Sequence, residues 1–200
     1  AAVLDAVASA EIYFGYGIAA ELIEAGRALR WVHSGAAGVG KSLTPAMLSS
    51  EVIFTNSAGI HAEPIAEYVI GMILFFGRGL DLAVTNQRTS AWHADAYYRD
   101  EAPLSELSTS TVGIVGYGGI GKEVARRAAS LGARVVALKR SEPGPDDAAL
   151  TPVGGGASLA SNIDVVNGAE GLDRVLSESD VLVLAAPETE RTRGMMDAGA

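Results

Sequence analysis

The sequence contains no cysteine, which excludes disulfides, thiolate catalysis and cysteine-based metal sites. This composition fits a reducing, cytoplasmic compartment, and no metal site is predicted. Basic residues are scarce: 15 Lys and Arg stand against 24 Asp and Glu, and the net charge is −9. Apolar runs fall well short of the roughly 20 residues that a membrane-spanning helix needs. We therefore predict no nucleic-acid partner and no membrane partner.

What the sequence does contain is a regular alternation of strand and helix patterns. Short apolar strands are predicted at 11–14, 29–33, 52–55, 134–138 and 181–185, with helical patterns between most of them. Such alternation indicates a parallel sheet and an α/β fold class. Because 48% of the 200 residues are hydrophobic, the chain is long enough for one or two domains with a real core.

The most apolar element is a predicted helix over residues 62–79, where Pro64 suits the first turn. A helix that is apolar on all sides is buried. We expect it to lie between domains or subunits, or as an ordinary core helix. On the first alternative, Met72, Phe75 and Phe76 are shielded in the intact protein.

Two further segments lack a clear period. Residues 81–110 are polar and mixed, and we expect them to cross from one domain to the next. Residues 141–163 are rich in Pro and Gly, which predicts a mobile surface excursion without an assigned function.

Residues 111–127 carry the pattern around which the chain is organised. A short buried strand over 112–115 leads into Gly116, Gly118 and Gly121, which have G-x-G-x-x-G spacing, and a helical pattern follows. In this strand–turn–helix context the spacing predicts a dinucleotide site. Gly116 allows the tight turn, Gly118 leaves room for a pyrophosphate, and Gly121 lets helix and strand pack closely. The helix N-terminus adds free N–H groups for the phosphates.

The end of the next strand, 134–138, predicts which dinucleotide binds. In NAD sites an Asp or Glu roughly 20 residues after the glycines binds the ribose 2′-hydroxyl. Here Lys139 takes that place, with Arg140 and Ser141 beside it. Two cations and a hydroxyl suit a 2′-phosphate, so we predict NADP, with NAD as the second choice. The alternative is a solvated basic strand end.

A second phosphate-binding pattern competes with the first. Residues 35–42 satisfy G-x-x-x-x-G-K-[ST], in which Lys41 would hold phosphates and Ser42 would bind Mg²⁺. Only eight residues separate Ser42 from Glu51, too few for a P-loop helix and a turn, and no later strand ends in an Asp for Mg²⁺. A P-loop NTPase is thus the weakest hypothesis, and binding of Mg²⁺-ATP would reveal it.

Four segments together resemble the D-isomer-specific 2-hydroxyacid dehydrogenase family, close to its glyoxylate/hydroxypyruvate reductase-like members. They lie in order at residues 29–39, 55–67, 116–121 and 179–194, and the resemblance covers nearly the whole chain. They are similar, in turn, to the substrate-carboxylate loop, the entry to a long interdomain helix, the cofactor loop, and the strand and turn beside the nicotinamide.

The resemblance implies a Rossmann-type parallel sheet domain and part of a flavodoxin-like substrate domain, joined by a long apolar helix. Residues 1–80 would form the partial substrate domain, with the interdomain helix over 62–79. Residues 81–110 would be the crossing segment, and residues 111–200 the partial dinucleotide-binding domain. The resemblance also implies a homodimer when the protein is full length.

The resemblance further implies site residues. The backbone N–H groups of Ala37 and Gly38 would bind a substrate carboxylate. The cofactor loop would contact the pyrophosphate, and the last strand and turn would line the cofactor cleft. With the strand end described above, the predicted cofactor-binding residues are Gly116, Tyr117, Gly118, Gly119, Ile120, Gly121, Lys139, Arg140, Ser141, Ala186, Pro187 and Thr192.

By the same resemblance the protein is an oxidoreductase that transfers a hydride between NAD(P)H and a small 2-oxo or 2-hydroxy acid. The family's catalytic Arg, Glu and His would lie beyond the motif at 192–194, and its first strand would precede the chain. We therefore expect a chain truncated at both ends, with no catalytic residue of its own and inactive alone.

Three histidines and one alternative function bear on this expectation. His33, His61 and His93 match no catalytic position and are expected to be structural or surface residues. The alternative is a catalytically silent NAD(P)-sensing binding protein. An Arg, a Glu and a Pro-His pair farther along the protein would favour the enzyme.

Overall fold

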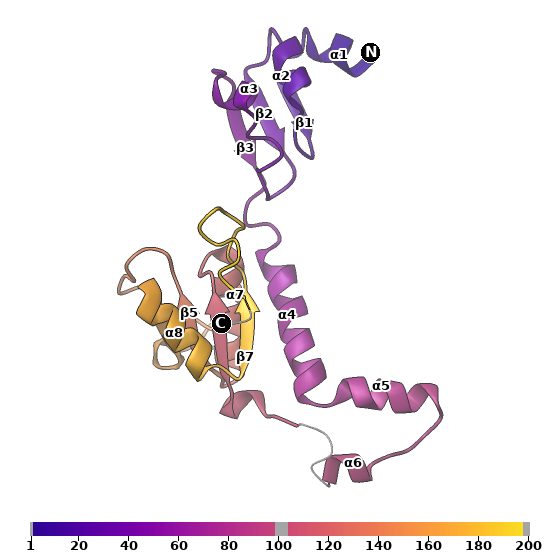
Figure 1. Ribbon diagram of the computed structural model, residues 1–200, viewed down its shortest axis with the longest axis vertical. Helices are drawn as coiled ribbons and strands as arrows, with labels where there is room; N and C mark the ends of the chain where they lie inside the picture. The colour runs from indigo at the N-terminus through magenta and orange to yellow at the C-terminus, as the bar shows by residue number, and fades with distance from the viewer. Residues whose placement is uncertain (1, 99–103, 198–200) are drawn as a thin grey trace. The chain divides into compact units, whose positions relative to one another are not determined.

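The chain forms two compact units, Ala1–His61 and Ala62–Ala200, each with its own parallel sheet (Figure 1). The structure is a computed structural model that describes residues 2–98 and 104–197. The predicted α/β class with parallel sheets is confirmed.

The first unit is a three-stranded parallel sheet with short helices. Its strands are β1 (Ile12–Gly15), β2 (Trp31–Ser34) and β3 (Ile53–Asn56), and its helices are α1 (Ala2–Val7), α2 (Ala20–Ala25) and α3 (Pro45–Leu48). The sheet order is β1-β2-β3. One apolar cluster forms its core, with Val7, Ile18, Ile23, Leu29, Val32 and Met47. Ile12, Trp31 and Ile53 are register partners that remain exposed on the sheet.

The second unit is a four-stranded parallel sheet in the order β6-β5-β4-β7. Its strands are β4 (Thr111–Val115), β5 (Arg134–Leu138), β6 (Ile163–Val166) and β7 (Val181–Leu184). Its helices are α4 (Ala62–Gly77), α5 (Leu80–Arg88), α6 (Asp95–Tyr98), α7 (Gly119–Ser130) and α8 (Gly168–Glu178), with 3-10 turns at Leu107–Thr109 and Ala160–Asn162. The chain steps outward from β4 to β6 and then returns to place β7 on the other side of β4. This reversal is the topological switch point at which doubly wound sheets bind ligands.

Side-chain alternation along the central strands explains the layers of this unit. Ile114 and Val135 belong to the cluster formed with α4 and α7, whereas Val115 and Val136 belong to the cluster formed with α8. Successive residues of a strand point to opposite faces, so an unbroken apolar run must be covered on both sides. Figure 1 shows α8 and α7 with the sheet between them.

Helix α4 is shorter and less buried than the sequence predicted. It ends at Gly77 rather than at 79, because Gly79 adopts a left-handed φ of 64° that breaks the helix before α5. Its buried residues, Ala62, Ala66 and Ile70, form a single face. Phe76 is 57% exposed, so shielding of its aromatic ring in the intact protein stays a prediction.

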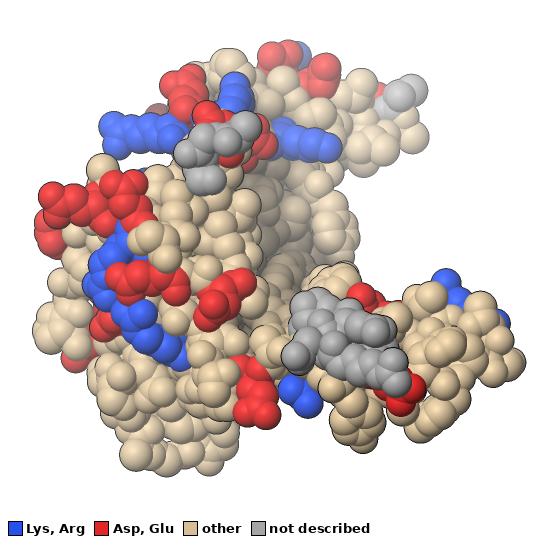
Figure 2. Space-filling model, turned by 60° about the horizontal axis from the view of Figure 1, so that its bottom comes forward, with Lys and Arg blue, Asp and Glu red and all other residues tan. Residues whose placement is uncertain are grey.

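No single helix in the described ranges is long and apolar enough to cross a membrane. Within the same ranges, α4 and α5 together have the length and apolar composition of a membrane span, but the pair is bent by 72°. On the face shown in Figure 2, Lys and Arg side chains lie among Asp and Glu side chains.

The excursion over 141–163 is tied to the core rather than projecting freely. Leu159 is buried, Leu150 packs against the same cluster, and the Leu159 N–H donates to the Leu150 carbonyl at 2.7 Å. The high Pro and Gly content therefore gives an irregular but anchored loop.

Candidate functional site

The first feature of the site is the turn that follows β4. Gly116 has a φ of 107°, which side chains rarely adopt. A Cβ there would also lie closer than 3.0 Å to the backbone of Ala186, just beyond β7. Conformation and space both require glycine, and the carboxyl ends of β4 and β7 meet at this residue.

The second feature is the open start of α7. Gly118 is the N-cap and has extended backbone, and no side chain caps the helix. A Cβ at Gly118 would meet nothing within 4 Å, so the space above the helix start is free. The first N–H groups of a helix have no acceptor within it and carry the positive end of its dipole. The arrangement can therefore bind an anion such as a pyrophosphate.

Gly121 holds the turn and the helix together. A Cβ there would lie closer than 3.0 Å to the carbonyl oxygen of Gly116 and 3.3 Å from Ile114. The third glycine of the motif thus serves packing between α7 and β4, as the sequence predicted.

Tyr117, which follows Gly116, has an inward-facing side chain. Its N–H donates to the Leu138 carbonyl at 3.1 Å, and its side chain is only 5% exposed. Its hydroxyl donates to the Asp147 carbonyl at 2.8 Å. Burial, together with the nearby Asp147 charge, raises the pKa of Tyr117 to about 12, so the phenol stays protonated. Tyr117 therefore anchors the loop that follows β5, and its contact with a pyrophosphate stays a prediction.

The predicted 2′-phosphate residues at the end of β5 have different surroundings. Lys139 Nζ donates to Asp147 Oδ2 at 2.6 Å, so this cation already has an anionic partner. Arg140 and Ser141 are exposed. Arg140 makes no ion pair with any residue in the described part of the chain.

The turn after β7 brings its predicted residues to the same end of the sheet. Ala186 lies against Gly116, and Pro187 follows it. The Thr192 hydroxyl donates to the Pro187 carbonyl at 2.7 Å and accepts from the Thr189 N–H at 2.8 Å. Thr192 therefore shapes the wall of the site from within the turn.

The candidate substrate loop lies in the first unit. Ala37 and Gly38 are exposed, and their N–H groups make no hydrogen bond to any residue that the structure describes. The Asn56 side-chain amide donates to the Ala37 carbonyl at 2.7 Å, which fixes the loop at the end of β3. Two free N–H groups on a fixed turn can donate hydrogen bonds to a carboxylate.

The competing P-loop pattern lacks the local structure that it requires. Lys41 and Ser42 lie in a turn, and the next helix begins only at Pro45 and ends at Leu48. Ser42 is 1% exposed, so its hydroxyl faces the interior. A P-loop places its Lys and Ser at the start of a helix, which residues 35–42 do not do.

His33 lies on β2 with both ring nitrogens close to hydroxyl groups. Nδ1 lies 2.9 Å from Thr55 Oγ1 and Nε2 lies 3.1 Å from Ser57 Oγ, and the ring stacks on Phe14. These contacts fit the structural role that the sequence predicted.

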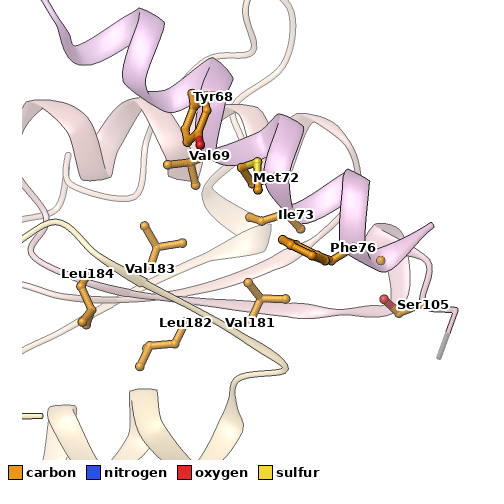
Figure 3. Close-up of a pocket in the computed structure, with 11 residues that line it drawn as sticks. Tyr68, Val69, Met72, Ile73, Phe76, Ser105, Val181, Leu182, Val183 and Leu184 are labelled. Atoms are coloured by element: carbon orange, nitrogen blue, oxygen red, sulfur yellow. The ribbon is translucent and has the colours of Figure 1, made fainter. Parts of the chain in front are cut away.

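An apolar cleft of about 590 Å³ opens between α4 and β7. Figure 3 shows Met72, Ile73 and Phe76 on the helix facing Val181 and Val183 on the strand. β7 is the edge strand of the described sheet, so its outer backbone groups face this cleft. The cleft was not predicted, because the sequence placed the helix and the strand in separate domains.

A family model described as D-isomer specific 2-hydroxyacid dehydrogenase, NAD binding domain, matches residues 70–200. The chain belongs to the D-isomer-specific 2-hydroxyacid dehydrogenase family. The predicted resemblance is thereby confirmed, and the Rossmann-type sheet of the second unit is the family's NAD binding domain.

Individual members of the 2-hydroxyacid dehydrogenase family agree. The chain is 29% identical over 182 residues to hydroxypyruvate reductase of Thermotoga maritima, covering 90% of this chain and 51% of the relative. A family protein from Klebsiella pneumoniae 342 is 25% identical with a TM-score of 0.74, covering 99% of this chain and 61% of that one. D-lactate dehydrogenase from Aquifex aeolicus, solved with NAD and lactic acid, shares the fold at 22% identity and a TM-score of 0.73, covering 94% of this chain and 52% of that one. The chain thus spans about half the length of these relatives.

Proposed function

We propose that the complete protein is an oxidoreductase that transfers a hydride between a nicotinamide dinucleotide and a small 2-oxo or 2-hydroxy acid. The observation that carries the proposal is the glycine turn at the switch point between β4 and β7. Family membership supplies the reaction class. When bound, the dinucleotide supplies or accepts the hydride at its nicotinamide ring.

The residues of this chain fit such a cofactor. The free space above Gly118 admits a pyrophosphate, and the N–H groups at the start of α7 would hold it. Ala186 and Pro187 would line the cleft beside the nicotinamide. The N–H groups of Ala37 and Gly38 would hold the substrate carboxylate and so orient the acid for transfer.

We also propose that the complete protein prefers NADPH to NADH and forms a homodimer. Arg140, two residues after β5, is exposed and makes no ion pair within residues 2–98 and 104–197. This supports the cofactor preference, because guanidinium groups bind phosphate by charge-assisted hydrogen bonds. The exposed Tyr68 and Phe76 on α4 support a subunit contact, because large apolar side chains in clusters mark interfaces.

Steady-state assays of the complete protein with glyoxylate or hydroxypyruvate test the reaction class and the cofactor preference. We expect turnover with both dinucleotides and a kcat/KM for NADPH about tenfold above that for NADH, as one charge-assisted contact from Arg140 would give. Arg140→Gln should remove most of this difference, and Arg193→Gln, which changes the charge equally in the exposed turn after β7, should preserve it.

Two results would contradict the proposals separately. Turnover of neither acid with either dinucleotide would contradict the reaction class. A kcat/KM for NADH equal to or above that for NADPH would contradict the cofactor preference alone.

A further inference from the structure

The loop over 141–163 places the Asp147 carboxylate next to Lys139, the residue that follows β5. Of the charged side chains that the structure describes, Asp147, 7% exposed, is the one that is buried. Its Oδ2 accepts from Lys139 Nζ at 2.6 Å and from the Gly144 N–H at 2.8 Å, and its Oδ1 accepts from Lys122 Nζ at 3.3 Å. The hydrogen bond from Lys139, with that from Gly144, lowers the pKa of Asp147 to about 2. The group is therefore an anion at any working pH.

The position of this anion bears on which dinucleotide the site would bind. Lys139 directly follows β5, where the dinucleotide fingerprint normally has the acid that binds the ribose 2′-hydroxyl. Lys122 comes from the first turn of α7, beside the pyrophosphate position. Two cations from the two elements that frame the ribose thus converge on one carboxylate.

The loop that supplies the carboxylate is held in place independently of the two lysines. The Tyr117 hydroxyl donates to the backbone carbonyl of Asp147, and Leu159 anchors the far side of the loop in the core. These contacts consequently fix the position of the Asp147 carboxylate.

We propose that Asp147 occupies the anion position that a 2′-phosphate would take between Lys139 and Lys122, and so limits discrimination in favour of NADP(H). This inference rests on the proposed dinucleotide site. A ligand with a 2′-phosphate must displace or repel a buried carboxylate to reach Lys139. A ligand with a 2′-hydroxyl carries no charge at that position and meets no such repulsion. Arg140 then supplies the preference for the 2′-phosphate, and Asp147 limits how large that preference can be.

Asp147→Asn tests the inference, with adenosine 2′,5′-bisphosphate and 5′-AMP as probes that differ only in the 2′-phosphate. The amide keeps an oxygen for the Gly144 N–H but removes the charge that neutralises Lys139. Calorimetry on the purified chain should show affinity for the bisphosphate raised about tenfold or more, with affinity for AMP changed less than about twofold. Lys139→Gln in the Asp147→Asn background should abolish the gain.

Asp146→Asn is the matched control, because Asp146 is exposed on the same loop and carries the same charge. An equal gain from Asp146→Asn would overturn the inference in favour of a general charge effect. An unchanged ratio of bisphosphate to AMP affinity in Asp147→Asn would overturn it directly. The ratio in the unmodified chain reports on the proposed NADP preference alone: a ratio of one or less contradicts that preference, whatever Asp147→Asn does.

A measurement on the unmodified chain covers the case in which Asp147→Asn fails to fold. Saturation with the bisphosphate should shift the amide resonances of Gly144, Asp146 and Asp147, since the carboxylate must yield its place. Saturation with AMP should leave them nearly unchanged. The same small shifts with both ligands would contradict the inference.

Discussion

Gly121→Ala is expected to lower the free energy of unfolding of the Ala62–Ala200 unit by about 1–3 kcal/mol and to abolish dinucleotide binding. The added Cβ would lie closer than 3.0 Å to the Gly116 carbonyl oxygen. This neighbour is backbone, so it cannot rotate away, and α7 must move off β4. Urea denaturation measures the stability loss, and calorimetry with NADPH measures binding.

Gly118→Thr is the matched control for this change. A Cβ at Gly118 meets nothing within 4 Å, and Thr is about as good an N-cap as Gly. Its free energy of unfolding should therefore stay within about 0.5 kcal/mol of the unmodified chain. The account of Gly121 is wrong if Gly121→Ala unfolds at the same urea concentration as Gly118→Thr.

The 200-residue chain by itself is expected to transfer hydride at least roughly 10²–10⁴-fold more slowly than a complete relative. Proton transfer needs a positioned general acid, and the family resemblance assigns none to this chain. His33 is held between Thr55 and Ser57 on the sheet of the first unit. Stabilising the developing alkoxide also needs a cation at the substrate oxygen, whose loss adds a further factor.

An assay of the purified chain with NADPH and glyoxylate or hydroxypyruvate measures this rate, with hydroxypyruvate reductase of Thermotoga maritima as the complete relative. Turnover within tenfold of that enzyme would show that the acid and the cation lie within these 200 residues.

The sequence predicted the elements that depend on local pattern. Strand β5 was predicted at its observed bounds, Arg134–Leu138, because an apolar run between Gly132 and Lys139 leaves little freedom. The strand–turn–helix around Gly116 was predicted because a backbone turn this tight requires glycine, and the glycine spacing is therefore visible in the sequence. Helix α5, in contrast, was missed, because none of its residues is buried and its short apolar face, Leu80, Ala83 and Val84, lies in a mixed polar segment.

The parts of the site that the sequence could not predict depend on tertiary contacts. Nothing in the Pro- and Gly-rich loop after β5 marks Asp147 as the partner of Lys139, since the irregular backbone of residues 140–146 separates them. The inward position of Tyr117 likewise depends on that loop lying over it. The sequence predicted Lys139 as a free cation, whereas in the fold it forms an ion pair with Asp147.

Binding of NADPH to the unmodified chain and to Gly118→Thr, followed by calorimetry, tests the central claim most directly. If the start of α7 holds the pyrophosphate, the unmodified chain should bind NADPH saturably, and Gly118→Thr should bind it at least about tenfold more weakly with unchanged stability. Equal affinity in the two proteins, or no binding to the unmodified chain, would contradict a dinucleotide site at this turn.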